Sequence, residues 1–179
     1  MKSIVSFFVS VLFASAASAD VVDVAPGGFE VKTLAHIAAP PEKVYDALTA
    51  PSRWWNSEHT FSHNAANLTL DARAGGCWCE TLPNGSVQHL VVVFADRPKV
   101  LRLKGALGPL QGLAVDGVFT WSMKPAADGA TDLAMDYRVG GYVKEGFADW
   151  SKAVDGVLGA QLARLKLYIE TGSPETPKP

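Results

Sequence analysis

The sequence lacks the patterns that mark nucleotide-dependent, nucleic-acid-binding or metal-dependent proteins. Neither a GxxxxGK[ST] nor a GxGxxG segment is present, so no phosphate-binding loop of a known type is expected. Sixteen lysines and arginines stand against eighteen aspartates and glutamates. The basic residues are scattered without a run, so nucleic acid is not an expected partner. There is also no metalloprotease motif, Ser-His-Asp pattern or paired acidic cluster.

The only long apolar run lies at the N-terminus and is too short for a membrane span of roughly 20 residues. Lys2 precedes an apolar stretch from Ile4 to Ala14, and Ala17-Ser18-Ala19 follows with the spacing that a signal peptidase recognises. We therefore predict a signal peptide over residues 1–19, cleavage before Asp20, and a periplasmic or secreted protein. No other segment of the sequence is expected to span a membrane.

Residues 20–179 have the length of one ordinary domain. We expect an N-terminal extension over residues 20–27, a single domain over residues 28–170 and a disordered tail over residues 171–179. Gly172 and Pro174 are expected to end the last helix before that tail.

Alternation of apolar and polar residues predicts a sheet with one apolar face that needs a cover. The alternation is clearest at Phe29–Ile37, Val115–Met123 and Leu133–Val139. Four further strands are expected at Leu68–Ala72, Cys77–Leu82, Val87–Ala95 and Val100–Lys104.

The spacing of apolar residues near the C-terminus predicts a helix that covers this apolar face. Apolar residues recur every three or four positions between Phe147 and Ile169, which is typical of a long amphipathic helix. Two short helices are expected after the first strand, one opened by Pro40-Pro41 and ended by Pro51, the other from Ser52 to Trp55. The polar segment 56–67 is expected to be a loop. The side chains predicted to face the long helix are Trp121, Met123, Met135 and Tyr137.

Three segments carry the motifs of a known superfamily. "IAAPPEKVYDALTAPSRWW" (residues 37–55) joins a strand end, a proline-led helix and a tryptophan, and "ARAGGCWCE" (72–80) has a Gly-Gly-aromatic strand start. "VVVFADRPKVLRL" (91–103) resembles a pair of central strands. Over residues 28–170 the chain thus resembles the START and pollen-allergen-like superfamily, SRPBCC. Its most similar branches are the polyketide-cyclase and lipid-transport group and the homologues of heat-shock-protein ATPase activators.

The resemblance implies an α+β helix-grip fold. In this fold a seven-stranded curved antiparallel sheet surrounds a long C-terminal helix, with two short helices after strand 1. A cavity is implied between the sheet and the long helix. Members of the superfamily include carriers, cyclases, hydrolases and co-chaperones, so the fold alone does not define the activity.

The expected ligand is a small apolar molecule, bound by a monomer without cofactor, metal or catalytic residue. The glycine-rich loops Gly105–Gly112 and Val139–Phe147 are expected to cover the cavity, although plain turns are the alternative. Gly156 and Gly159 in the long helix are expected either to admit a close neighbour or to leave room beneath the helix. The predicted ligand-binding residues are Trp54, Trp55, Cys77, Cys79, Leu107, Leu110, Phe119, Trp121, Met135, Tyr137, Tyr142, Phe147 and Trp150.

Cys77 and Cys79 occupy alternate positions of a predicted strand, so both point to one face and Trp78 to the other. Their Cα atoms would lie about 6.5 Å apart in an extended strand, near the upper limit for a disulfide. A bridge between them would need a bulge, which Gly75 and Gly76 could supply.

Alternatives for the cysteine pair are a disulfide, a copper or zinc clip completed by His59, His63 or His89, and pocket-lining thiols. A two-residue turn at Asn84-Gly85 would place Glu80 opposite His89, whereas a three-residue turn would place Cys79 there. We favour a Glu80–His89 contact on the solvent-exposed face. The thiols, reduced or reversibly paired, would then point into the cavity and Trp78 outward.

Two classes of function follow. The first is an exported carrier or binding protein for a hydrophobic molecule, which we favour. The alternative is a cyclase- or hydrolase-like enzyme in which Cys77, Cys79, Glu80 or His89 supplies acid–base or nucleophilic chemistry. A co-chaperone acting on an ATPase does not fit export.

Overall fold

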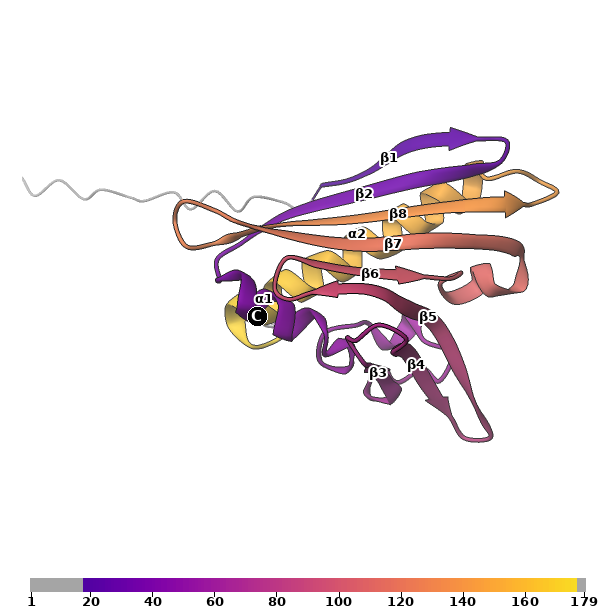
Figure 1. Ribbon diagram of the computed structural model, residues 1–179. Coiled ribbons are helices and arrows are strands. Elements are labelled where there is room, and N and C mark those ends of the chain that lie inside the picture. Colours follow the sequence, from indigo (N-terminus) through magenta and orange to yellow (C-terminus); the bar gives the residue numbers. More distant parts are fainter. Residues whose placement is uncertain (1–17, 177–179) are drawn as a thin grey trace, which may run out of the picture.

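A single antiparallel sheet packs against one long helix in the computed structural model, which describes residues 18–176 (Figure 1). The eight strands found among these residues follow the order β1-β2-β8-β7-β6-β5-β4-β3 across the sheet. Their bounds are Ser18–Ala25 (β1), Gly28–Ile37 (β2), Leu68–Leu70 (β3), Cys77–Leu82 (β4), Gly85–Asp96 (β5), Val100–Lys104 (β6), Ala114–Pro125 (β7) and Thr131–Tyr142 (β8). The helices are α1 (Pro41–Leu48) and α2 (Ala148–Thr171), with 3-10 turns η1 (Pro51–Arg53), η2 (Ser57–His59), η3 (Ala65–Asn67) and η4 (Gly108–Gly112).

The predicted helix-grip architecture is confirmed. Helices α1 and η1 are the two short helices expected after the first main strand, and α2 spans the predicted amphipathic segment. Helix α2 ends at Thr171, because Gly172 adopts φ 84° and its N–H donates to the carbonyl of Tyr168. The segment expected to be a loop contains η2 and η3.

Strand β1 is an addition to the seven expected strands. It pairs along β2 as the edge of the sheet and occupies most of the predicted N-terminal extension. Val22 and Val24 are exposed in it, so β1 lacks the apolar alternation that marks the other strands, and its backbone pairing with β2 defines it. Most of the predicted signal peptide, residues 1–17, lies outside the described residues.

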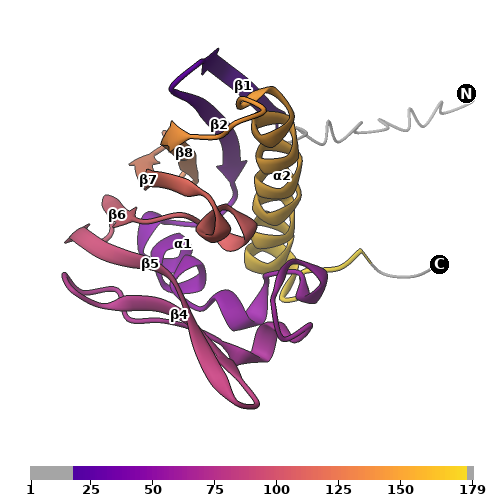
Figure 2. The same cartoon turned by 90° about the vertical axis from the view of Figure 1, so that its right-hand side faces the viewer.

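Helix α2 crosses the concave face of the sheet but lies closest to β1 and β2 (Figure 2). Strands β3 to β6 make few contacts with it. The space on that side is filled partly by α1, by the turns η1 to η3 and by η4. This uneven packing positions the candidate site described below.

Aromatic side chains join the inner faces of β4, β7 and β8. Trp78 contacts Trp55 and Trp121, with ring centroids 5.0 Å and 5.5 Å apart. Phe119 lies 4.7 Å from Trp121 and 5.2 Å from Tyr137 in edge-to-face arrangements. Such pairs add about 0.5–1.5 kcal/mol each beyond their buried area. The cluster therefore stabilises the sheet where α2 does not reach it.

The inward orientation predicted for four side chains is confirmed. Trp121, Met123, Met135 and Tyr137 are each at most 3% exposed and belong to the hydrophobic core on the inner side of the sheet.

Gly156 does not serve either role expected from the sequence. It is exposed on α2, and a Cβ added to it would meet no heavy atom within 4 Å. It therefore neither admits a close neighbour nor leaves room beneath the helix.

We predict that Gly156→Ala raises the free energy of unfolding by roughly 0.5–1 kcal/mol, because alanine restricts the unfolded chain and no contact opposes it. Gly117→Ala is the matched contrast, since its Cβ would lie 2.6 Å from the ring of Tyr137 and 2.8 Å from the Arg138 carbonyl oxygen. That change should cost about 1–3 kcal/mol. Urea denaturation measures both, and a destabilised Gly156→Ala variant would contradict the prediction.

Candidate ligand-binding cavity

A cavity of about 300 Å³ lies between α2, η4 and the inner face of β4 and β5. Its wall is almost entirely apolar or aromatic. Helix α2 contributes Trp150, Ala153, Val154, Val157 and Leu158, and the segment around η4 contributes Leu107 to Leu110. The cavity lies where α2 diverges from the sheet.

Five of the residues predicted to bind ligand line this cavity: Trp55, Leu107, Leu110, Tyr137 and Trp150. The loop Gly105–Gly112, which was expected to cover the cavity, therefore forms part of its wall. The Tyr137 hydroxyl accepts a hydrogen bond from the N–H of Leu107 (2.9 Å) and donates to the carbonyl of Gly105 (3.0 Å). Burial raises the pKa of Tyr137, so the hydroxyl keeps its proton and holds the loop in place.

The remaining aromatic candidates and Met135 lie elsewhere. Trp54, Phe119, Trp121 and Met135 are buried in the core, and Phe147 packs on Phe29 with ring centroids 5.8 Å apart. Tyr142 is 69% exposed at the end of β8. The second predicted cavity loop, Val139–Phe147, contributes no residue to the cavity wall. The sequence pattern identified which side chains point inward, but not which of them line the cavity and which are buried in the core.

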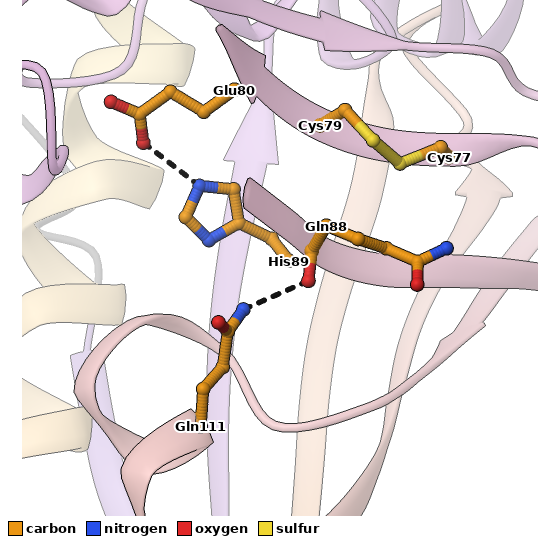
Figure 3. The surroundings of a disulfide bond; sticks show 6 residues. All are labelled: Cys77, Cys79, Glu80, Gln88, His89 and Gln111. Atoms are coloured by element: carbon orange, nitrogen blue, oxygen red, sulfur yellow. Dashed lines mark hydrogen bonds and ion pairs between the residues drawn. A yellow bond between two sulfur atoms is a disulfide. The ribbon is translucent and has the colours of Figure 1, made fainter. Parts of the chain in front are cut away.

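Cys77 and Cys79 form a disulfide on the face of β4 opposite the cavity (Figure 3). Their Cα atoms are 5.4 Å apart, shorter than in an extended strand. Trp78 and Glu80 are 1% exposed on the inner face, whereas both cysteines are half-buried. The predictions that the cysteines point inward and Trp78 outward are therefore wrong.

The bridge lies on the outer side of β4, and Trp78, between the two cysteines, lies in the cavity wall on the inner side. The metal-clip alternative is also wrong for this pair, because the two sulfur atoms are bonded to each other. Among residues 18–176 no group of three or more His, Cys, Asp or Glu side chains could hold a metal ion. A bridge between residues two apart closes a very short loop and adds little stability.

Glu80 decides which face of β4 is buried. Its carboxylate accepts hydrogen bonds from the N–H groups of Phe61 (3.1 Å) and Ser62 (2.5 Å), and Oε2 lies 3.0 Å from Nε2 of His89. Burial would raise the pKa of Glu80, but these hydrogen bonds outweigh it and lower that pKa. Glu80 is therefore an ionised, buried acceptor. Its assignment to the solvent-exposed face was wrong because its donors come from a distant loop.

A β-bulge brings His89 to the same side. Trp78 pairs with Leu90 and Cys79 with Gln88, which leaves His89 as the extra residue of β5. His89 and Leu90 are consequently both buried. The turn comprises Pro83-Asn84 rather than Asn84-Gly85, so Glu80 lies opposite Val87. The predicted contact between Glu80 and His89 is confirmed, with a different register.

His89 is held as a neutral imidazole with its proton on Nε2. Burial lowers the pKa of His89, and the neighbouring Glu80 only partly offsets this effect. Because the ionised Glu80 can only accept, Nε2 donates to it and Nδ1 is left as an acceptor. Phe61 stacks on the ring with centroids 5.9 Å apart. The side chains of Phe61 and His89 both belong to the cavity wall.

A second histidine at the cavity is oriented by a buried glutamine. Gln161 of α2 is fully buried, and its Oε1 accepts a hydrogen bond from the N–H of Asn56 (2.9 Å). Its amide nitrogen therefore donates to Nδ1 of His59 (2.8 Å), which places the proton of a neutral His59 on Nε2. His59 is exposed at the cavity wall.

The sequence interpretation did not include Trp78, Phe61 or the helix residues Val154, Val157 and Leu158 among the ligand-binding residues. The helical repeat between Phe147 and Ile169 could have indicated the three helix residues, since they lie on its apolar face. Trp78 and Phe61 could not be found in this way, because the burial of Glu80 against a remote loop determines their positions.

An apolar cavity enclosed by a curved antiparallel sheet and one long C-terminal helix defines a helix-grip protein. The chain belongs to the polyketide cyclase/dehydrase and lipid transport family, whose sequence profile matches residues 28–170. No curated protein matches the chain. In residues 18–176 no helix is both long and apolar enough to span a membrane.

Solved structures share this fold at low sequence identity. A conserved protein of unknown function from Enterococcus faecalis is 16% identical with a TM-score of 0.61, covering 90% of this chain and 82% of its own. An uncharacterized protein from Rhizobium leguminosarum is 19% identical with a TM-score of 0.59, and the match covers 87% of this chain and 99% of that protein. The Aha1 dimer from Colwellia psychrerythraea is 17% identical with a TM-score of 0.54, and the match covers 80% of this chain and 97% of that protein. At these sequence identities the similarity shows a shared fold and nothing more specific.

We predict that His89 makes the protein less stable as the pH falls. Its folded pKa is lowered, so the unfolded chain binds the proton first, and stability present above about pH 6.5 is lost as the pH falls below it. Relative to wild type, His89→Gln should lose this dependence, whose slope is at most about 1.4 kcal/mol per pH unit. Urea denaturation between pH 7.5 and 5 measures the difference.

His36→Gln is the control, because His36 should affect the pH dependence of stability in the opposite direction. Hydrogen bonds to Asp132 and Asp128 raise the pKa of His36, so its stabilisation is complete below about pH 6.5 and is lost as the pH rises through its folded pKa. A His89→Gln variant with the same pH dependence as wild type would contradict the assignment of a neutral, buried imidazole.

Proposed function

We propose that the protein binds a small, largely apolar molecule in the cavity between α2 and strands β4 and β5. The observation that carries this proposal is the cavity itself: a space of about 300 Å³, open on one side, that is lined by tryptophan, leucine and valine side chains. Ligand pockets commonly have volumes of roughly 300–1,000 Å³ and mostly apolar walls. A molecule with about two fused rings, or an acyl chain of similar volume, matches this space. The lipid transport named in the family description supports the same proposal.

Binding accounts for the state of Glu80 and of the two cysteines better than catalysis does. Both carboxylate oxygens of Glu80 already accept hydrogen bonds from the protein. The cysteines considered as nucleophiles are bonded to each other on the outer face of β4. Glu80 is therefore occupied by internal hydrogen bonds, and the two cysteines offer no thiol nucleophile to the cavity.

We predict that naphthalene binds with a dissociation constant in the micromolar to submillimolar range, as expected for about ten apolar atoms in a matching cavity. Val157→Trp should weaken this binding at least tenfold, because the larger side chain fills space that Val157 borders. Equilibrium dialysis measures both. Ala160→Trp introduces the same side chain at an exposed α2 position outside the cavity wall and should leave the affinity unchanged. Equal affinities for all three proteins would contradict binding in this cavity.

We also propose that the protein acts outside the cytoplasm, after cleavage before Asp20. The N-terminal apolar run and Ala17-Ser18-Ala19 support export, and the Cys77–Cys79 disulfide suits an oxidising compartment. Cleavage there would remove Ser18 and Ala19, which pair with Leu34 and Thr33, and leave the rest of β1 on the sheet edge.

Expression of the full chain in a Gram-negative host should therefore yield a periplasmic protein whose intact mass corresponds to residues 20–179. Ala19→Tyr should block processing, because signal peptidase requires a small residue before the cleaved bond. The readouts are the intact mass and the cell fraction. Wild-type protein that keeps residues 1–19 in the cytoplasm would contradict export.

A further inference from the structure

Two ring nitrogens of the cavity wall have no hydrogen-bond partner. They are Nε1 of Trp78 and Nδ1 of His89, both buried and without a partner among residues 18–176. Trp78 is 1% exposed and His89 is 6% exposed. Buried polar groups are nearly always satisfied, and those that are not call for an explanation. Because both residues line the same cavity, a bound molecule can supply the partner.

The two nitrogens have opposite hydrogen-bonding roles. The indole Nε1 of Trp78 can only donate. Nδ1 of His89 can only accept, because Nε2 carries the proton that is donated to Glu80. In Figure 3 the unbonded nitrogen of His89 lies on the ring edge that faces η4, whose residues form another wall of the cavity. The two ring centroids are 6.5 Å apart, a separation that one small group can bridge when both nitrogens turn toward it.

Both rings are held in place before any ligand binds. Trp78 is packed between Trp55 and Trp121. His89 is covered by Phe61 and bonded to Glu80. These contacts restrain both rings. Each nitrogen has less than 1 Å² of accessible surface, so a ligand group reaches it after a small rotation of the ring. A polar group that bonds to both nitrogens offsets the free-energy cost of that rotation.

We propose that the ligand carries a neutral hydroxyl group that Trp78 and His89 recognise together. Its oxygen accepts a hydrogen bond from Nε1–H of Trp78, and its O–H donates to Nδ1 of His89. A hydroxyl is the smallest group that accepts and donates at one atom. An ether or a ketone would satisfy only Trp78, and a carboxylate could not donate to His89. This inference rests on the proposed function and narrows the ligand to a phenol or alcohol with a body of about two rings.

Three probes of nearly equal shape test the inference: 2-naphthol, 2-methoxynaphthalene and naphthalene. Equilibrium dialysis against wild-type protein at pH 7 should show 2-naphthol binding at least tenfold more tightly than 2-methoxynaphthalene, because only the former can donate to His89. In His89→Phe the ratio of these two dissociation constants should fall to about one. Trp78→Phe should reduce the preference for 2-naphthol over naphthalene. His36→Gln, in β2 and outside the cavity wall, should keep the wild-type ratio.

The outcomes distinguish hydroxyl recognition from the proposed binding of an apolar molecule, on which it rests. If the three probes bind wild-type protein with equal affinity, hydroxyl recognition is wrong and apolar binding stands. If none of the three binds, both are wrong. A wild-type preference that persists in both His89→Phe and Trp78→Phe would overturn the assignment to these two nitrogens. Should His89→Phe fail to fold, the wild-type comparison and Trp78→Phe decide the question.

Discussion

The buried carboxylate of Glu80 is the constraint on which the candidate site depends. An ionised group without water must be fully hydrogen-bonded, and here the partners are two N–H groups of the segment after η2 and the imidazole of His89. These bonds hold the 56–67 segment against the sheet and place Phe61 at the cavity. They also fix the protonated nitrogen of His89. Because side chains alternate along a strand, the burial of Glu80 turns Trp78 inward and the cysteines outward.

The cavity arises from uneven packing of one helix on a curved sheet. Helix α2 lies against β1 and β2 and diverges from β4 and β5. Aromatic side chains fill part of the resulting space, and Tyr137 holds the η4 loop over the rest through bonds to Leu107 and Gly105. The walls are thus rigid elements joined by a core aromatic cluster. A site built in this way discriminates by shape and by the few polar atoms that its walls leave unpaired.

The disulfide and the bulge act on the same stretch of sheet. The Cα atoms of Cys77 and Cys79 lie 5.4 Å apart on either side of Trp78, while the bulge adds His89 to β5 between the partners of Trp78 and Cys79. The bulge places the ring of His89 on the cavity side. The bridge lies on the opposite face of β4 and closes too short a loop to stabilise the fold much.

Local patterns in the sequence determined the seven main strands, α2 and its C-terminal stop, because the periods of two and 3.6 residues reflect only the local backbone. They also pointed to five residues that line the cavity: Trp55, Tyr137 and Trp150 from strand and helix patterns, and Leu107 and Leu110 from an unusually apolar glycine-rich loop. Only the tertiary structure decided the faces of Cys77, Trp78 and Glu80, since the groups that satisfy Glu80 lie 18 and 19 residues away in the chain. It likewise decided the bulge at His89 and the pairing of β1, because strand register and edge pairing depend on backbone hydrogen bonds between segments that are distant in sequence.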